Sequence, residues 1–240
     1  MNEIRTSVVA VGPLQGYLAA PRDGSGVGMV LLPMITGIGA QVREYAEDIA
    51  ATGITALVWD PFHGPNADDT PRERLYELMN GLDDDAALAE IRGLTDHLLG
   101  ELGAERVGVL GYCLGGRLAL LAGARDERLA NVIAYHPSIP AVPAANHTHD
   151  TVADAARIAA PVMVLHAGAD TIMTADVFAD LQRSLLSRTS GATIVHVYPG
   201  AEHGFSTRAR HGNPVNADAY ALSWPQALNF MAQTLAAGRP

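Results

Sequence analysis

Cysteine is almost absent from this chain of 240 residues, because Cys113 is the only one. A single cysteine excludes a disulfide framework within the chain. That usage fits a reducing compartment, and we expect a cytoplasmic protein. Residues 1–11 contain Glu3 and Arg5 and no long apolar run, so no secretory signal peptide is predicted.

Basic residues are also scarce, since 16 arginines and no lysine stand against 26 aspartates and glutamates, for a net charge of −10. No run of basic residues is present, so nucleic acid and anionic membranes are poor partners. One long uncharged stretch, residues 24–42, contains five glycines and Pro33, which indicates a buried strand and a loop, not a membrane helix. With 48% hydrophobic residues, the length suits one domain spanning residues 1–240.

Apolar runs alternate with amphipathic segments along the chain. The runs predict strands at residues 27–34, 55–59, 106–110, 132–135, 161–166 and 193–198. Helical spacing predicts helices at residues 40–51, 84–99, 114–122, 175–186 and 218–235, the last interrupted near Pro225. Two apolar runs in residues 7–19, separated by Gly12-Pro13, predict an antiparallel hairpin. The fold class is therefore α/β, with a mostly parallel central sheet and helices on both faces.

The strongest motif is the run Gly-Tyr-Cys-Leu-Gly-Gly at residues 111–116, which follows a predicted strand and opens a predicted helix. This is the setting of a nucleophile elbow, G-x-S-x-G, with cysteine in place of serine. Glycines two positions either side of Cys113 let neighbouring backbone pass close to a strained turn. The helix dipole favours a thiolate, and the Leu114 N–H is free to face an oxyanion. The alternative interpretation is a small buried cysteine in a glycine-rich turn.

A nucleophile needs a base and a group that orients the base. In this kind of fold the acid and then the histidine follow the nucleophile along the chain. Asp170 and His203 each come just after a predicted strand, where ligands sit in open parallel sheets, so we expect both beside Cys113. The alternatives are a turn or helix-capping role for Asp170 and a structural role for His203. Asp176 and Glu202 are weaker rivals for the acid.

Taken in this order, the run at 111–116, Gly168-Ala169-Asp170 and His203-Gly204-Phe205 resemble the dienelactone hydrolase family. The resemblance extends from the strand at Val27 to the C-terminal helix. It implies an α/β-hydrolase fold in which Cys113 is the nucleophile, His203 the base and Asp170 the orienting acid. It also implies hydrolysis of a cyclic enol ester, a dienelactone, to a linear dicarboxylic acid.

The same resemblance implies a site for the substrate's carboxylate. The family has an arginine after the triad histidine, and an arginine and a tyrosine four residues apart before the helix that precedes the nucleophile strand. Arg208 matches the first position, and Arg72 and Tyr76 match the second. A guanidinium can hold a carboxylate through two parallel hydrogen bonds. The alternative for each arginine is a solvated surface charge.

One position departs from the family pattern. Met34 stands where family members with understood chemistry carry a glutamate that helps to activate the resting thiol, and methionine cannot accept a proton. Cys113 would then depend on His203 and the helix dipole, with a hydrogen bond from Thr36 as a further option. The Ile35 N–H is the second candidate oxyanion donor, because that role needs only backbone.

Other motifs carry less chemistry. Residues 37–39, Gly-Ile-Gly, lack the third glycine of a dinucleotide fingerprint. The run His-Thr-His-Asp at 147–150 lacks a ligand spacing typical of metal sites, which favours a solvated loop. His136 and His63 each follow a predicted strand and are candidates for the pocket wall, with capping of the strand end as the alternative for His136.

We therefore expect a hydrolase of a small ester or lactone, carboxylate-bearing, that needs no cofactor and no metal and works as a monomer or small homo-oligomer. A broader carboxylesterase or thioesterase is the alternative within the same class. The alternative from another class is a non-catalytic ligand-binding protein on a hydrolase scaffold, which the departure at Met34 motivates.

Overall fold

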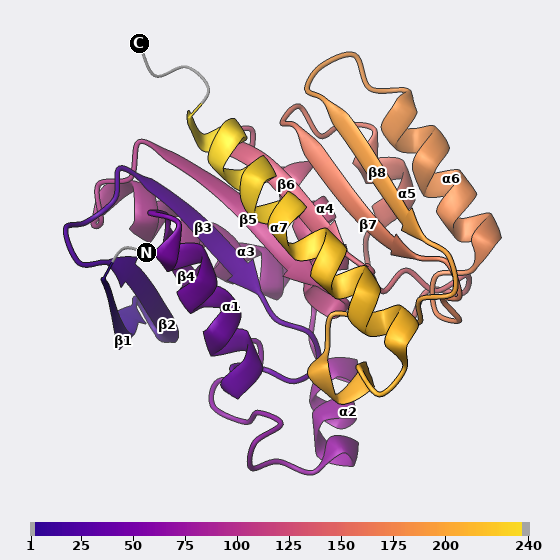
Figure 1. Cartoon of the computed structure of the whole chain (residues 1–240), viewed down its shortest axis with the longest axis horizontal. Helices are drawn as coiled ribbons and strands as arrows, with labels where there is room; N and C mark the ends of the chain where they lie inside the picture. The colour runs from indigo at the N-terminus through magenta and orange to yellow at the C-terminus, as the bar shows by residue number, and fades with distance from the viewer. Residues whose placement is uncertain (1–2, 237–240) are drawn as a thin grey trace.

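An eight-stranded sheet forms the centre of the computed structural model, which describes residues 3–236 (Figure 1). Its strands are β1 (Ile4–Val11), β2 (Leu14–Pro21), β3 (Val27–Leu32), β4 (Thr55–Val58), β5 (Arg106–Tyr112), β6 (Leu129–Tyr135), β7 (Val162–Ala167) and β8 (Thr193–Tyr198). They lie in the order β1-β2-β4-β3-β5-β6-β7-β8. The β1–β2 and β2–β4 pairs are antiparallel and the other pairs are parallel, so the carboxyl ends of β3 to β8 share one edge.

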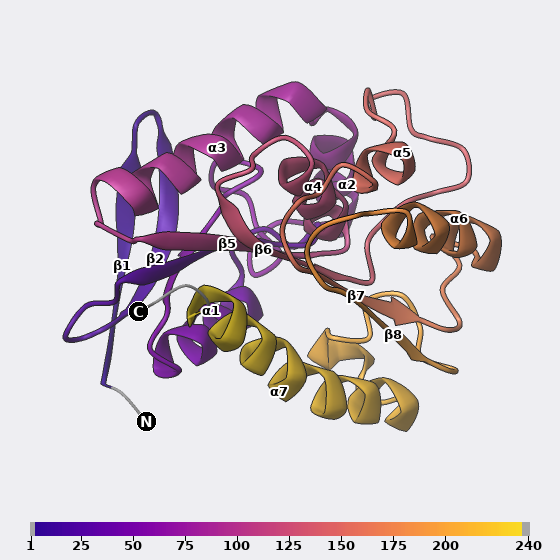
Figure 2. The same cartoon turned by 90° about the horizontal axis from the view of Figure 1, so that it is seen from above.

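Helices cover both faces of this sheet (Figure 2). One face carries α1 (Ala40–Ala51) and α7 (Pro214–Ala236). The other carries α2 (Arg72–Asn80), α3 (Asp84–Gly100), α4 (Leu114–Gly123), α5 (Thr151–Ala155) and α6 (Ala175–Leu186). A 3-10 turn, η1 (Arg208–Arg210), precedes α7. Among residues 3–236, none of the helices combines the length and the apolar character that a membrane span requires.

The two faces bury separate cores, because successive residues of a strand point to opposite sides of a sheet. In β3, Val30 and Leu32 pack with the layer of α3 and α4, whereas Met29 and Leu31 pack with α1 and α7. Every residue of β3 is buried, as its continuous apolar run predicts. The predicted α/β architecture with its N-terminal hairpin is confirmed.

Element boundaries differ from the predictions by a few residues. β3 ends at Leu32 because Pro33 has no N–H to donate to a neighbouring strand. The predicted interruption near Pro225 is wrong, since α7 continues through that residue. Proline removes one helical hydrogen bond there, but Trp224 and Ala227 are buried against the sheet and keep the helix in place. The sequence did not indicate α2 or α5; α2, for example, buries only Leu75, too little for a periodic signal.

Candidate active site

Cys113 occupies a strained turn between β5 and α4. Its backbone has φ 52° and ψ −111°, a conformation that residues with a side chain rarely adopt. Hydrogen bonds hold the turn on both sides: the Cys113 N–H donates to the Tyr135 carbonyl at 3.0 Å, and its carbonyl accepts from the Ser138 N–H at 2.9 Å. The turn aims the side chain out of the sheet at the carboxyl ends of the strands.

The glycines of the motif are required by backbone contacts. A Cβ atom on Gly111 would lie 2.0 Å from the Gly115 carbonyl oxygen. A Cβ atom on Gly115 would lie 2.3 Å from the Leu32 carbonyl oxygen at the end of β3. No side chain could rotate away from either contact, because the atoms involved belong to the main chain. The spacing of glycines in the sequence therefore reflects how closely α4 approaches β3 and β5.

His203 bridges the Cys113 thiol and the Asp170 carboxylate. Its Nε2 lies 3.1 Å from the Cys113 sulfur, and its Nδ1 lies 2.8 Å from Oδ2 of Asp170. The three residues come from the loops that follow β5, β7 and β8, so the parallel sheet brings together positions up to 90 residues apart. The side chain of Asp170 is completely buried, and that of His203 is 11% exposed.

Asp170 also holds its own loop. Its Oδ1 accepts hydrogen bonds from the Ile172 N–H at 2.8 Å and the Met173 N–H at 3.1 Å. The sequence analysis treated the turn role and the contact with the histidine as alternatives. Asp170 performs both, because each uses a different oxygen of its carboxylate. The rivals are placed elsewhere: Asp176 lies exposed in the first turn of α6, and Glu202 accepts from Asn216 at 2.9 Å.

Cys113 and His203 shift each other's pKa. Burial alone would raise the pKa of the Cys113 thiol, but the charge and hydrogen bond of His203 lower it below its usual value, with help from the Leu114 N–H. Burial alone would lower the pKa of His203, but the Cys113 thiolate and the Asp170 carboxylate raise it to about 10. Both shifts favour a thiolate beside an imidazolium at neutral pH.

The backbone offers two N–H groups for an oxyanion. Among residues 3–236, neither the Leu114 N–H nor the Ile35 N–H donates a hydrogen bond to a carbonyl or side-chain oxygen. Leu114 is the first residue of α4, where N–H groups have no partner inside the helix. Ile35 lies in the loop after β3, which Gly115 contacts by donating to the Pro33 carbonyl at 3.2 Å.

Met34 is buried, with 5% of its surface exposed, and its sulfur accepts a hydrogen bond from the Thr207 hydroxyl at 3.3 Å. The thiol therefore has no carboxylate from this position, as the sequence indicates. The Thr36 hydroxyl is buried without a hydrogen-bond partner among the described residues, so it does not bond to the Cys113 sulfur. His203 is the group that lowers the pKa of the thiol.

The structure does not join Arg72, Tyr76 and Arg208 into one group. Arg72 and Tyr76 share a face of α2, where the guanidinium donates to the tyrosine hydroxyl at 2.9 Å. Arg208 lies on η1 and forms a two-point ion pair with Glu44 of α1, one of its bonds being 3.0 Å long. Arg72 is exposed, and the Arg208 side chain is 65% exposed.

His136 is a neighbour of His203 whose placement the sequence left open. It follows β6 with φ 33°, is fully buried, and its ring packs edge-on at 5.2 Å from the ring of His203. Burial, and secondarily the charge of His203, lower its pKa well below its usual value, so it is neutral. Its Nε2 lies 2.8 Å from the hydroxyl of Ser206, a residue that no sequence pattern singled out. The only sequence signal for Ser206 is that it directly follows the motif His203-Gly204-Phe205.

The remaining histidines of interest have structural contacts. His63, with φ 53°, lies 3.0 Å from Glu90 of α3, and its side chain is 60% exposed. His149 lies 2.6 Å from Asp85, and Asp150 caps the N-terminus of α5. No group of three potential metal ligands occurs among residues 3–236.

Comparisons with known proteins find relatives that match most of the chain. The family model described as "Dienelactone hydrolase family" matches residues 14–235. The carboxymethylenebutenolidase of Rhodococcus opacus is 29% identical over 226 residues, which cover 92% of this chain and 87% of that protein.

Two solved structures share the fold at lower identity. A protein of Klebsiella pneumoniae subsp. pneumoniae MGH 78578 has a TM-score of 0.84 at 22% identity, covering 97% of this chain and 100% of the other. An alpha/beta hydrolase from Penicillium sp. sh18 has a TM-score of 0.72 at 14% identity, covering 98% and 99%. These likenesses support the α/β-hydrolase fold.

Proposed function

The chain belongs to the dienelactone hydrolase family, and we propose on this premise that Cys113 is the nucleophile, His203 the general base and Asp170 the orienting acid of its reaction. Family membership and the related carboxymethylenebutenolidase make the chain a hydrolase of ester or lactone bonds, which removes the alternative of a non-catalytic binding protein. The observation that carries the assignment of roles is the pair of contacts made by His203, 3.1 Å to sulfur and 2.8 Å to carboxylate.

The first half of the proposed reaction forms a thioester. The Cys113 thiolate attacks the carbonyl carbon, and the carbonyl oxygen takes up the negative charge between the N–H groups of Leu114 and Ile35. The carbon–oxygen bond of the ester then breaks. The departing enolate or alkoxide takes the proton from His203, and the acyl group remains on sulfur.

The second half releases the acid. His203, now neutral, accepts a proton from a water molecule whose oxygen attacks the thioester carbonyl. The carbon–sulfur bond breaks, the acid leaves, and the thiolate and imidazolium are restored together. Asp170 stabilises the positive imidazole in both halves without itself taking up the proton.

The substrate that we propose is a small lactone with a carboxylate near its ester bond, a cyclic enol ester that opens to a linear dicarboxylic acid. The carboxymethylenebutenolidase relative supports this chemistry. Arg72 supports it too, because among residues 3–236 its guanidinium contacts the neutral side chain of Tyr76 and no carboxylate. Helix α2, which carries both residues, lies at the end of the molecule toward which the parallel strands point (Figure 1).

A broader carboxylesterase or thioesterase is the second candidate, and two observations favour it. Met34 presents an apolar side chain where, by the resemblance, family members with understood chemistry carry a glutamate. Glu44 already neutralises Arg208, so one of the two cationic positions for an acidic substrate is occupied from within the protein. Both features suit neutral acyl groups.

The test compares the wild type with Cys113→Ala on two substrates, a carboxylate-bearing dienelactone and the neutral p-nitrophenyl acetate. We expect the variant to lose at least about 10³-fold in kcat on both, because no nucleophile remains. Since Cys113 is the one thiol of the chain, a mass gain with substrate that the wild type shows and Cys113→Ala lacks reports a thioester at Cys113.

Each outcome selects one reading. Wild-type turnover in a folded Cys113→Ala protein, with an unchanged melting temperature, would refute the nucleophile. Good turnover of the neutral ester with none of the dienelactone would select the broader esterase. Preference for the dienelactone supports the first proposal.

A further inference from the structure

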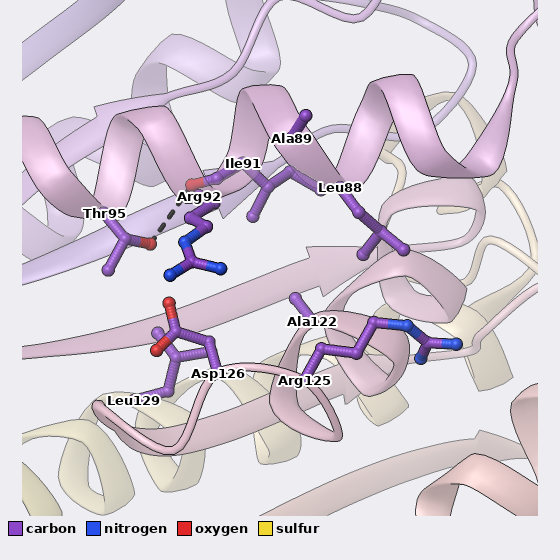
Figure 3. A pocket seen from close by; sticks show the side chains of 9 residues that line it. All are labelled: Leu88, Ala89, Ile91, Arg92, Thr95, Ala122, Arg125, Asp126 and Leu129. Carbon is purple, nitrogen blue, oxygen red and sulfur yellow. Dashed lines mark hydrogen bonds between the residues drawn. The ribbon is translucent and has the colours of Figure 1, made fainter.

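A cavity of about 240 Å³ lies between α3, the last residues of α4 and the start of β6 (Figure 3). Cys113 precedes α4, whereas this cavity begins near its last turn at Ala122. A ten-residue helix is about 15 Å long. None of the residues that line the cavity belongs to the proposed catalytic site.

The walls of the cavity are mostly apolar. They are formed by Leu88, Ala89 and Ile91 of α3, by Ala122 of α4, and by Leu129 of β6. Figure 3 shows the side chains of Leu88 and Ile91 extending from α3 toward the segment that carries Ala122 and Arg125. Such a surface suits a hydrocarbon body more than a sugar or a nucleotide.

Ion pairs join the elements on either side of the cavity. Arg128 donates to Asp96 of α3 at 2.6 Å and to Asp126 at 2.7 Å, so it ties the α4–β6 connection to α3. Arg125 donates to Asp154 at 2.6 Å and to the Leu121 carbonyl at 3.1 Å. The contacts of Arg128 fix the spacing between α3 and the α4–β6 connection, and small-molecule sites are usually pre-formed in this way.

One arginine at the cavity forms no ion pair within the described part of the chain. Two arginines and one aspartate line it: Arg125 is paired with Asp154 of α5, and Asp126 is paired with Arg128. Arg92 is exposed on α3; among residues 3–236 it has no carboxylate within 4.0 Å, although its charge acts on Asp126 from across the cavity. Figure 3 shows its guanidinium turned from α3 toward Asp126, across the cavity.

We propose that this cavity binds a small carboxylate with an apolar body about the size of one ring. The carboxylate would pair with Arg92, and the body would contact Leu88, Ile91 and Leu129. The volume lies below the roughly 300 Å³ at which pockets for drug-sized ligands begin, which limits the body to one ring. A cationic ligand is disfavoured, because Arg128 already occupies the Asp126 carboxylate.

The experiment is a titration followed by ¹H–¹⁵N NMR spectra, with benzoate as the probe and benzamide as its neutral counterpart. The protein is first alkylated at Cys113 with iodoacetamide, which blocks the catalytic site. We expect benzoate to shift the amides of Leu88, Arg92 and Asp126 with a dissociation constant in the millimolar range. Benzamide should bind more weakly, because it lacks the charge that pairs with Arg92.

Variants separate the charge from the apolar contact. Arg92→Gln should weaken benzoate about fivefold and leave benzamide unchanged. Leu88→Ala should weaken both probes. Arg22→Gln is the matched control, since Arg22 is an exposed arginine paired with Glu3 on the N-terminal hairpin and should change neither probe.

Three results would overturn the proposal. They are the absence of amide shifts at the cavity with about 20 mM benzoate, equal affinity for benzoate and benzamide, and an unchanged affinity for benzoate in a folded Arg92→Gln protein. Because the catalytic thiol is blocked throughout, none of these results bears on the proposed reaction.

Discussion

Two regions lie at the same end of the sheet: the group Cys113, His203 and Asp170, and the arginines proposed to bind the substrate. They differ in how far their side chains are buried. The Asp170 side chain is wholly buried and His203 is 11% exposed, and each donor or acceptor has a partner. The Arg208 side chain is 65% exposed and is held by Glu44. Buried groups are positioned by the backbone around them, whereas an exposed arginine takes whichever carboxylate is near. Changes in the first region should therefore be large and independent of substrate, and changes in the second small and substrate-specific.

The largest effect is expected from Asp170→Asn, which should lower kcat by about 10³- to 10⁴-fold, because an amide no longer stabilises the imidazolium or its tautomer. The loss should be the same for the dienelactone and the neutral ester. Steady-state kinetics on both substrates measure it. Asp176→Asn is the matched control on the exposed first turn of α6 and should leave kcat within about twofold. Equal losses in the two variants would contradict the role of Asp170.

The next effect concerns stability. Gly115→Ala should lower the free energy of unfolding by about 3 kcal/mol or more, because the new Cβ would lie 2.3 Å from a main-chain oxygen that cannot rotate away. Gly93→Ala on α3 is the opposite case, since nothing lies within 4 Å of its Cβ position. It should stabilise by about 0.5–1 kcal/mol through helix propensity. Urea unfolding measures both, and a loss below about 1 kcal/mol in Gly115→Ala would mean that the turn relaxes.

The pH dependence of the thiol is the third test. Because the pKa of Cys113 is lowered and that of His203 is raised to about 10, the thiolate–imidazolium pair should persist through neutral pH. Alkylation by iodoacetamide should therefore be fast at pH 7 and change little up to about pH 9. A rate that rises with an ordinary thiol pKa would contradict this. The raised pKa of His203 also means that the protonated imidazole stabilises the folded protein. This contribution to the free energy of unfolding is complete below the usual pKa near 6.5 and is lost as the pH rises through about 10.

The smallest effects belong to the exposed arginines. Arg72→Gln should raise KM for the dienelactone about three- to fivefold and leave KM for the neutral ester unchanged. Glu44→Gln should act in the opposite direction, because it frees Arg208 for the substrate's carboxylate. Arg74→Gln, which removes a second exposed arginine of α2 that is paired with Glu77 at 2.8 Å, is the control. If these variants changed KM for the neutral ester as much as KM for the dienelactone, neither Arg72 nor Arg208 would bind the substrate's carboxylate.

Much of the fold could be predicted because the buried positions of helices and strands recur at regular intervals in the sequence as apolar residues. The continuous apolar run of β3 and the helical spacing in α3 both followed from which faces are covered. The failure at Pro225 has the same origin. A local rule forbids proline inside a helix, but burial of Trp224 and Ala227 outweighs one lost hydrogen bond.

The candidate site was predictable only in part. Cys113, Asp170 and His203 could be selected because each follows a strand in a parallel sheet, where the carboxyl ends meet. Two other contacts, Ser206 with His136 and Glu44 with Arg208, could not be predicted, because neither pair has a spacing that a sequence rule describes. Both depend on how α1 and the segment after β8 pack against the sheet.

By itself the sequence determined the order of strands and helices, the turn at Cys113 and the glycines around it, since these depend on local sterics and on which residues avoid water. Only the tertiary structure decided that the imidazole of His203 lies 3.1 Å from the sulfur, that Glu44 forms an ion pair with Arg208, and that Arg92 lies beside a cavity. The physical reason is that contacts between distant segments depend on distances of a few ångströms, and these are set by the packing of whole layers.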